Sequence, residues 1–531
     1  MESSSSTGSA AAAPPAARLV ARPHVVLLAS PGAGHLTPLA ELARRLVELH
    51  GFAATVVTFT NFSAPDQLAC LPASVATAAL PAVQIDDLPA DAGNGGVLVE
   101  LARRSLPNIR ALVRSISTSS TAPLAALVPD FFCSSALPIA AELGVPGYLF
   151  FPSNLTFVAF MRHIVERNEG AAPGEYRDLV VPVELPGGVS LCGADLPEHQ
   201  LYGQLVEWGR SYCLADGVLV NTFYEMEPAA VEAFRQLAVP EQGSGAFFFP
   251  PVFPVGPSVR RPDRHEPTAG ALSPCLEWLD LQPAGSVVYL SFGSGGQLSV
   301  EQTAELAAGL EGSGQRFLWV VRMPSTDARR CGAAYDDPLA WLPEGFLARM
   351  NGRGLAVASW APQVRVLAHP ATAAFVSHCG WNSTLESVGC GVPMLAWPMY
   401  AEQRTNALIL EEKLGVALRM PSSLADDRRL VTRHEIVKAV KELVEGGEKV
   451  RRRAEDLREA AARAWSPEGP SRRALEEVAV KWKAALEADF LTASAPGPRY
   501  PVRWQQLLRL CLIAQHFLSI WKILHFFITT V

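Results

Sequence analysis

A histidine stands in a glycine loop near the start of the chain, where it could act as a general base. His35 belongs to the segment SPGAGHLTP at residues 30–38, which follows the apolar run HVVLLA and precedes the helical pattern LAELARRLVEL. Imidazole titrates near neutrality, which suits a base that takes a proton from an attacking hydroxyl. The loop follows a predicted strand, so His35 is expected at the carboxyl edge of a sheet. Taken alone, a histidine in such a loop is more often structural.

The loop around His35 does not match either common nucleotide-binding fingerprint. A dinucleotide-binding loop requires a third glycine near the helix start and an acidic residue about 20 positions later. GAGHLT has no third glycine, and the next apolar strand, ATVVTFTNF, ends without Asp or Glu. A P-loop requires G-x-x-x-x-G-K-[ST], and this segment contains no lysine. These mismatches argue against a dehydrogenase and against a P-loop protein.

An aspartate at the end of another predicted strand could orient the histidine. Asp130 ends the apolar run LAALVPD at residues 124–130. The carboxyl ends of parallel strands lie at one edge of a sheet, so Asp130 is expected at the same edge as His35. A carboxylate bonded to one imidazole nitrogen orients the ring and stabilises the imidazolium that forms. Taken alone, Asp130 is more often a turn or helix-cap residue.

A second group of polar residues stands where a helix follows a buried strand. His378, Asn382 and Ser383 lie between the strand AAFVSH and the helical segment GWNSTLES. Free N–H groups and the positive end of the helix dipole attract phosphate at such a position. Glu386 lies one turn beyond Asn382 on the same face, where a carboxylate would repel phosphate but accept hydrogen bonds from ribose hydroxyls. Asn382 and Ser383 also fit ordinary N-capping.

Two similar halves are expected to position these groups. Short apolar strands alternate with helical segments over the first half of the chain, and the alternation starts again near residue 286. Near-continuous apolar strands between helices indicate parallel sheets covered on both faces. We therefore expect an α/β protein with two doubly wound, Rossmann-like domains that face each other across a cleft.

Composition and charge narrow the class of protein. The 531 residues are 49% hydrophobic and 18% charged, as in a globular protein, and a net charge of −7 without a basic stripe argues against a nucleic-acid partner. The nine cysteines form no C-x-x-C pair, which favours reduced thiols in the cytoplasm. The chain has neither zinc-ligand spacing nor a D-x-D motif, so we expect no metal and no cofactor. We also expect a monomer.

The longest informative segment runs from Trp360 to Gln403, WAPQVRVLAHPATAAFVSHCGWNSTLESVGCGVPMLAWPMYAEQ. It closely resembles the signature box of the plant secondary-product UDP-glycosyltransferases, family 1, in length, order and spacing. The similarity extends over about residues 23–487. The segments EYRDLVVPVELPG and LPEGFLARMNGRG are similar to the subgroup that glucosylates small phenols, such as hydroquinone glucosyltransferases. The resemblance implies the GT-B fold and a hexosyltransferase activity.

The resemblance also implies roles for individual residues. It makes His35 and Asp130 the catalytic pair. It assigns UDP to Trp360 at the uracil, Gln363 and Glu386 at the nucleoside, Ser294, His378, Asn382 and Ser383 at the diphosphate, and also to Ala361 and Trp381. It assigns the sugar to Trp381, Glu402 and Gln403. Outside such a box, Trp360 would be interpreted as a core aromatic and Ser294 as a turn residue.

The expected reaction is a single displacement that turns an α-linked donor into a β-O-glucoside of a small phenol. Trp381 and Gln403 match family members that use UDP-glucose, whereas His at the last box position would suggest galactose and Arg at position 381 glucuronic acid. Three alternatives stay open: another UDP-sugar, a nitrogen or sulfur acceptor, and a catalytically silent protein that binds sugar nucleotides.

Composition and resemblance together divide the chain into segments. They are a disordered lead at 1–22, an N-terminal acceptor-binding domain at 23–250, a proline-rich linker at 251–274, a C-terminal UDP-sugar-binding domain at 275–470, a C-terminal helix at 471–487 and an atypical apolar tail at 488–531. Arg509 and Lys522 interrupt the tail, and the uninterrupted pieces are too short to span a bilayer. The tail could pack on the body, lie on a membrane surface or have no function, and we prefer the last interpretation.

Overall fold

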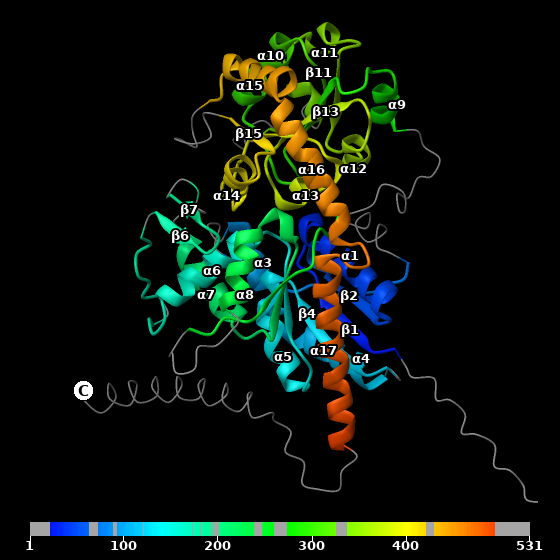
Figure 1. Ribbon diagram of the computed structural model, residues 1–531, viewed down its shortest axis with the longest axis vertical. Coiled ribbons are helices and arrows are strands. Elements are labelled where there is room, and N and C mark those ends of the chain that lie inside the picture. The colour runs from blue at the N-terminus through cyan, green and yellow to red at the C-terminus, as the bar shows by residue number, and fades with distance from the viewer. Residues whose placement is uncertain are drawn as a thin grey trace, which may run out of the picture.

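The described part of the chain forms two lobes, each built on parallel strands between helices (Figure 1). The computed structural model describes residues 22–62, 73–88, 93–119, 122–172, 174–180, 182–192, 195, 201–237, 247–259, 273–324, 337–420 and 430–493. The expected disordered lead lies outside these residues except for Arg22, and the apolar tail lies outside them beyond residue 493.

The N-terminal lobe contains a four-stranded and a three-stranded parallel sheet, ordered β3-β2-β1-β4 and β5-β8-β9. Isolated bridges from Leu127 to Gly147 and from Asp130 to Phe150 join β4 to β5. The strands are β1 His24–Leu28, β2 Ala53–Phe59, β3 Ala76–Leu80, β4 Leu124–Pro129, β5 Tyr148–Phe151, β8 Gly217–Val220 and β9 Val252–Pro254, and a hairpin is formed by β6 Val183–Leu185 and β7 Val189–Leu191. β4, β5 and β8 are buried at every position, as expected for strands covered on both faces.

Helices cover both faces of this lobe. They are α1 Ala33–His50, α3 Gly93–Arg104, α4 Leu106–Ser119, α5 Leu137–Glu142, α6 Leu155–Arg167, α7 Tyr202–Tyr212 and α8 Pro228–Leu237, with the short 3-10 helices η1 Thr60–Phe62, η2 Phe131–Ala136 and η5 Tyr224–Met226. α1 begins directly after Gly32, whose φ of 110° is a conformation that side-chain-bearing residues avoid. His35 therefore lies in the first turn of α1 rather than in the loop before it.

The C-terminal lobe has a six-stranded parallel sheet in the order β12-β11-β10-β13-β14-β15. Its strands are β10 Val287–Ser291, β11 Arg316–Val321, β12 Gly354–Ala358, β13 Thr372–Ser377, β14 Met394–Ala396 and β15 Ala417–Arg419. Counted within the lobe, this is the doubly wound order 3-2-1-4-5-6, which places a ligand crevice at the carboxyl ends of β10 and β13. The expected α/β architecture of two doubly wound domains is confirmed.

The helices of the C-terminal lobe include the short α13, which opens directly after β13. The helices in the described part of this lobe are α9 Pro274–Asp280, α10 Val300–Ser313, η7 Pro338–Trp341, α11 Phe346–Arg349, α12 Gln363–Leu367, α13 Trp381–Cys390, α14 Gln403–Leu408, the π-helix η8 Ile409–Lys413, α15 Arg433–Gly446 and α16 Glu448–Ala464. α10 starts at Ser299, whose side chain accepts from the Gln302 N–H, and α15 starts with a capping box between Thr432 and Glu435.

The last helix returns to the N-terminal lobe. α17 Pro470–Ala493 runs along that lobe from the end of α16, and Leu475, Val478 and Trp482 are fully buried in its core (Figure 1). The Trp482 ring lies 5.2 Å from the ring of Tyr148. The helix is thus longer than the expected 471–487, and it extends into the segment expected to be a tail.

The expected linker is also shorter than composition indicates. β9 at Val252–Pro254 pairs in parallel with β8 and completes the sheet of the N-terminal lobe, although it lies inside the proline-rich segment 251–274. A three-residue strand at a sheet edge tolerates the flanking prolines because only one side of it must donate hydrogen bonds. Residues 260–272 lie outside the described part of the chain.

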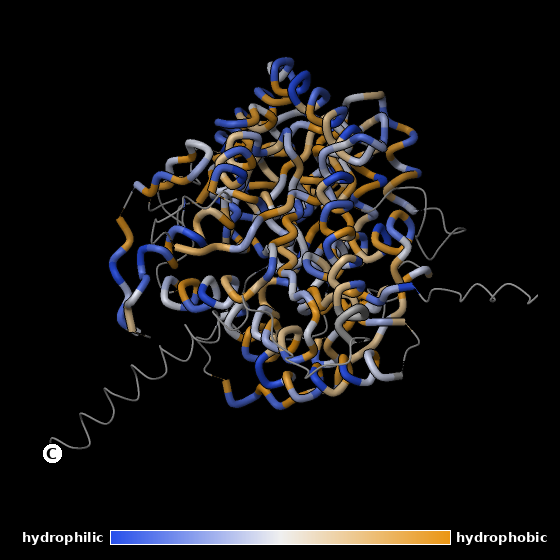
Figure 2. The backbone as a smooth tube through the Cα atoms, turned by 60° about the horizontal axis from the view of Figure 1, so that its bottom comes forward, coloured by the Kyte–Doolittle hydropathy of each residue, from blue (hydrophilic) through white to orange (hydrophobic). Residues whose placement is uncertain are grey.

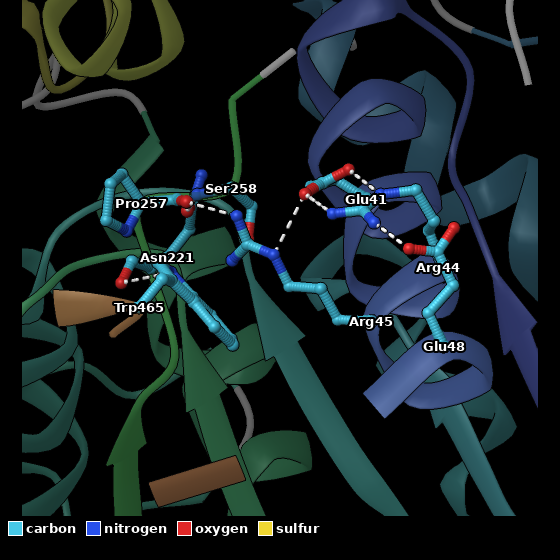
Figure 3. Close-up of polar contacts among 9 residues, drawn as sticks. Glu41, Arg44, Arg45, Glu48, Asn221, Pro257, Ser258 and Trp465 are labelled. Atoms are coloured by element: carbon cyan, nitrogen blue, oxygen red, sulfur yellow. Dashed lines mark hydrogen bonds and ion pairs between the residues drawn. The ribbon is translucent and has the colours of Figure 1, made fainter. Parts of the chain in front are cut away.

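An arginine of α1 holds together the two points at which the chain crosses between the lobes (Figure 3). Arg45 donates to the carbonyl of Pro257 over 2.8 Å and to the Glu41 carboxylate over 2.9 Å. Its guanidinium stacks 3.6 Å from the ring centroid of Trp465, and the Trp465 indole donates to the carbonyl of Gly256 over 3.0 Å. We call these five residues the hinge cluster, because both chain crossings meet there.

Hydrophobic segments are concentrated inside both lobes, and hydrophilic segments lie on outer helical turns (Figure 2). Among the described residues, no helix has the length and apolarity that a bilayer crossing requires.

Candidate active site

The structure brings the two predicted catalytic residues into contact. His35 Nδ1 lies 3.1 Å from Asp130 Oδ2, and the side chain of His35 is 20% exposed while that of Asp130 is fully buried. A carboxylate only accepts hydrogen bonds, so Nδ1 carries the hydrogen and Nε2 is left as the nitrogen that can take a proton. The arrangement matches a general base held by its orienting carboxylate.

Asp130 is fixed in place by backbone and hydroxyl donors. Its Oδ2 accepts from the Ser30 N–H over 2.9 Å and also from the Ser30 hydroxyl. Its Oδ1 accepts from the Cys133 N–H over 3.2 Å and caps η2. The observed capping role of Asp130 is therefore compatible with its predicted role in orienting His35. Burial and the neighbouring carboxylate raise the pKa of the Cys133 thiol well above its usual range, so this cysteine is not a nucleophile.

Aromatic rings surround the imidazole. The rings of Phe131 and Phe132 lie 5.3 Å and 5.2 Å from the His35 ring, centroid to centroid. Trp208 meets Phe132 edge-on at 5.4 Å. A Cβ added to Gly95 would lie 2.8 Å from the Trp208 ring, so this glycine makes room for the indole. The surroundings of the base suit a flat apolar molecule with a hydroxyl.

His378 occupies the carboxyl edge of the C-terminal sheet in a neutral form. Burial lowers its pKa to about 4. A Cβ at either Gly293 or Gly380 would collide with the imidazole, which explains the glycines in FGSGG and in HCGWNS. Within the described part of the chain, Nδ1 of His378 is buried and has no hydrogen-bond partner. A ligand at this edge could satisfy it.

The start of α13 contacts the N-terminal lobe at two places. The Trp381 indole, which is 3% exposed, donates to the carbonyl of Asn221 over 2.7 Å. The Asn382 amide donates to the carbonyl of Gly34 over 2.7 Å. Gly34 directly precedes His35, so a predicted diphosphate residue touches the turn that carries the predicted base.

The predicted nucleoside residues form one hydrogen-bonded group. Gln363 Nε2 donates to Glu386 Oε2 over 2.6 Å and to Ser383 Oγ over 3.0 Å, while the Tyr289 hydroxyl reaches Gln363 Oε1 over 3.3 Å. These hydrogen bonds hold the side chains of α12 and α13 in fixed positions relative to each other.

Trp360 is exposed rather than part of the core. Its relative exposure of 66% is unusual for so large an apolar side chain, and it overturns the core-aromatic alternative. Ala361 beside it is 5% exposed, and Ser294, after β10, is exposed. These residues lie at the carboxyl ends of β12 and β10, at the sheet edge where the box is expected to bind its ligand.

The two residues expected at the sugar are held by neighbouring groups. Glu402 accepts from the hydroxyl of Ser153 across the lobes over 3.1 Å. Gln403 is 4% exposed, and its Oε1 accepts from the N–H groups of Met399 and Tyr400 over 2.9 Å and 3.1 Å. The side-chain carbonyl of Gln403 is therefore already bonded to the backbone of the turn that precedes α14.

Comparison with known proteins identifies the family. Residues 268–451 match the family described as UDP-glucoronosyl and UDP-glucosyl transferase. UDP-glycosyltransferase 72B1 of Arabidopsis thaliana is 42% identical over 478 residues, which are 87% of this chain and 96% of that protein. This chain belongs to the plant family 1 UDP-glycosyltransferases. Hydroquinone glucosyltransferase of Rauvolfia serpentina is likewise 42% identical, over 88% of this chain and 99% of that protein.

Solved structures of related UDP-glycosyltransferases share the GT-B fold of this enzyme. The Polygonum tinctorium UDP-glucosyltransferase capable of glucosylating indoxyl, in complex with 3,4-dichloroaniline, aligns with a TM-score of 0.76 at 41% identity, covering 87% of this chain and 99% of that one. Phytolacca americana UGT2 with UDP-2fluoro-glucose and pterostilbene aligns with a TM-score of 0.74 at 40% identity, covering 87% and 99%.

Sequence reasoning missed several polar residues of this UDP-glycosyltransferase site. Ser30 is 1% exposed and binds Asp130 twice, and its position after β1 in the quoted segment could have revealed it. Asn154 caps α6, and its amide donates across the lobes to Asn406. No local sequence pattern predicts this contact. Within the described residues, no group of three or more His, Cys, Asp or Glu could hold a metal.

Proposed function

We propose that this enzyme transfers glucose from UDP-glucose to the hydroxyl of a small phenolic metabolite, with inversion at the anomeric carbon and without a metal ion. The observation that carries the proposal is the His35–Asp130 pair, connected through Gly34 to Asn382 of the donor box. Relatives named for hydroquinone glucosylation and for indoxyl glucosylation support a flat aromatic acceptor.

The reaction proceeds in one displacement. His35 Nε2 takes the proton of the acceptor hydroxyl, and Asp130 stabilises the imidazolium that forms. The acceptor oxygen bonds to the anomeric carbon on the face opposite UDP, and the bond from that carbon to the β-phosphate oxygen breaks. The electron pair leaves with UDP, so an α-linked donor gives a β-glucoside.

The aromatic rings around His35 support the choice of acceptor. Phe131 and Phe132 approach the imidazole at just over 5 Å between ring centroids. A phenol can pack on these faces while its hydroxyl reaches Nε2, because aromatic pairs are favourable at centroid separations of about 4.5–7 Å. A sugar acceptor would gain less from the same surface.

The leaving UDP can be stabilised without a metal. The start of α13 presents its N–H groups and its positive dipole end, with Asn382 and Ser383 in the first turn. The Nδ1 atom of His378 supplies a further polar group at the same edge. Trp381 and Gln403 support UDP-glucose as the donor through their match to glucose-using relatives.

Product analysis tests this function. The purified full chain is incubated with hydroquinone and each of UDP-glucose, UDP-galactose and UDP-glucuronic acid, with and without EDTA. We expect a β-glucoside, identified by mass and by its anomeric proton coupling, from UDP-glucose in both conditions. No glucoside, an α-anomer or loss of activity in EDTA would each contradict the corresponding part of the proposal.

We also propose that the enzyme is a cytoplasmic monomer. Free thiols at Cys133, Cys192, Cys213, Cys275, Cys379 and Cys390 support a reducing compartment. A fluorescent fusion of the full chain, followed in plant cells, tests the location, and light scattering of the purified chain tests the oligomeric state. A membrane-bound signal or a dimer mass would contradict the proposal.

A further inference from the structure

An arginine stands at the carboxyl edge of the C-terminal sheet between two segments of the donor site. Arg322 directly follows β11, which pairs with β10 on one side and β12 on the other. Continuing the register from Val321 and Ala358 places Arg322 level with Ser359, just before Trp360. On the other side, the β10 register places it level with Gly293, just before Ser294.

The guanidinium of Arg322 has no counter-charge in the described part of the chain. Its Nε is buried there without a hydrogen-bond partner. Burial lowers the pKa of Arg322, and the groups that act on it electrostatically are the hydroxyls of Tyr289 and Tyr400 rather than a carboxylate. Its positive charge in turn helps to lower the pKa of His378. Arg322 therefore lies in the neighbourhood of His378 with its charge uncompensated.

Two arginines with little side-chain exposure are paired with carboxylates, whereas Arg353 shares with Arg322 a buried Nε without a partner among the described residues. Arg419 is 9% exposed at its side chain and lies 2.8 Å from Glu411 and 3.8 Å from Asp195. Arg45 is bonded to Glu41. Arg353 lies before β12 at the amino end of its strand, but Arg322 lies at the carboxyl edge where a ligand is expected. A charge that is partly removed from water is stabilised by an opposite charge, so the unpartnered Nε at this edge points to an anion.

The contacts of Tyr400 indicate that Arg322 lies near the loop that follows β10. A Cβ at Gly295 would lie 2.7 Å from the Tyr400 hydroxyl, so the Tyr400 side chain lies on this loop. Arg322 shares its surroundings with Tyr400 and with His378, which abuts Gly293 of the same loop. These are the positions at which the diphosphate is expected from Ser294 and His378.

We propose that Arg322 binds the diphosphate of the UDP-sugar and neutralises the charge that develops on UDP as it leaves. The inference rests on the proposed function and deepens it. When the bond between the anomeric carbon and the β-phosphate oxygen breaks, its electron pair remains on that oxygen. A guanidinium donates hydrogen bonds to phosphate oxygens and stays charged throughout.

Binding of UDP and of uridine separates this role from a structural one. Calorimetry compares the unmodified chain with Arg322→Gln, with Arg322→Lys and with a control, Arg316→Gln. Arg316 lies at the opposite end of β11 and donates to the side chain of Gln282 over 3.0 Å. We expect Arg322→Gln to weaken UDP roughly 10- to 100-fold, the effect of losing a hydrogen bond to a charged group, and to leave uridine unchanged. Arg322→Lys should restore part of the loss, and Arg316→Gln should match the unmodified chain.

Two results would overturn the role of Arg322. UDP affinity of Arg322→Gln within about twofold of the unmodified chain would show that the diphosphate does not use the arginine, and equal losses of UDP and uridine would show a structural role. Failure of the proposed function would look different. The unmodified chain would then bind UDP without converting UDP-glucose and hydroquinone, and the Arg322 comparison would still be measurable.

Discussion

Replacing Asp130 with asparagine separates the charge of this residue from its position. Oδ2 accepts from the N–H and the hydroxyl of Ser30 and from His35, while Oδ1 accepts from the Cys133 N–H. An asparagine can keep its single oxygen at the Oδ2 position and retain three of these four donors. The imidazole then keeps its orientation, but its partner is neutral.

The size of the effect follows from these contacts. The Cys133 N–H keeps its 3.0 Å bond to the backbone carbonyl of Asp130 but loses the side-chain acceptor and faces an amide N–H₂, which costs about 0.5–1.5 kcal/mol of folding stability. For the reaction, a carboxylate and an imidazolium about 4 Å apart attract each other by about 4 kcal/mol at an effective dielectric constant near 20. That energy corresponds to roughly a thousandfold in rate, so we expect kcat to fall about 10²- to 10³-fold.

Glucosylation rates, UDP affinity and thermal unfolding are measured on Asp130→Asn and on a control, Asp216→Asn. Asp216 lies in the same lobe and also accepts a backbone N–H, from Gly147 over 2.9 Å, so the control should lose stability without a large change in kcat. UDP affinity should stay unchanged in both variants, because neither residue belongs to the donor box. A kcat of Asp130→Asn within about threefold of the unmodified enzyme, or a parallel loss of UDP affinity, would refute the catalytic role.

Three further predictions concern stability. The pKa of His378 is about 4 in the folded chain against 6.5 ordinarily, so the unfolded chain binds the proton first as the pH falls. The free energy of unfolding therefore falls as the pH drops from 6.5 toward 4. In unfolding experiments at pH 7.5 and pH 5, His378→Asn should remove about 2 kcal/mol of this loss. Arg45→Met should cost about 2–4 kcal/mol in urea unfolding, because it removes the bond to Pro257 and leaves Glu41 with one arginine fewer. Trp482→Ala should cost about 3–5 kcal/mol and lower the melting temperature, whereas Val480→Ala on the exposed face of α17 should change it little.

Local sequence patterns were sufficient to predict the positions of the residues that follow buried strands. Asp130 and His378 each come directly after a continuous apolar run, and parallel strands bring their carboxyl ends to one edge. The first turn of α1 shows the limit of this reasoning. GAGHLT resembles a loop because of its glycines, yet only Gly32 has a positive φ, and helical geometry begins at Ala33.

Contacts between distant segments could not be predicted in this way. Nothing near Trp381 in the sequence indicates that its indole donates to Asn221, 160 positions away. The same holds for Arg45 and Trp465, which meet because α17 returns to the N-terminal lobe after α16 has left it. Such pairings depend on how the two lobes dock, and a periodicity of 2 or 3.6 residues carries no information about docking.

The polar contacts between the lobes also bear on how the reaction can be gated. Asn382 bonds Gly34 and Glu402 bonds Ser153, so residues expected at the diphosphate and at the sugar both contact the lobe that carries His35. The Asn382–Gly34 bond contributes about 0.5–1.5 kcal/mol net and the bond to the Glu402 carboxylate about 1.5–3 kcal/mol, and lobes joined by such contacts are expected to move relative to each other. The hinge cluster, in contrast, is buried except for Trp465, which is partly buried, and Arg45 bonds it on several sides. Opening at the site with a pivot at the hinge cluster would therefore move the proposed base His35 away from the residues expected to bind the donor.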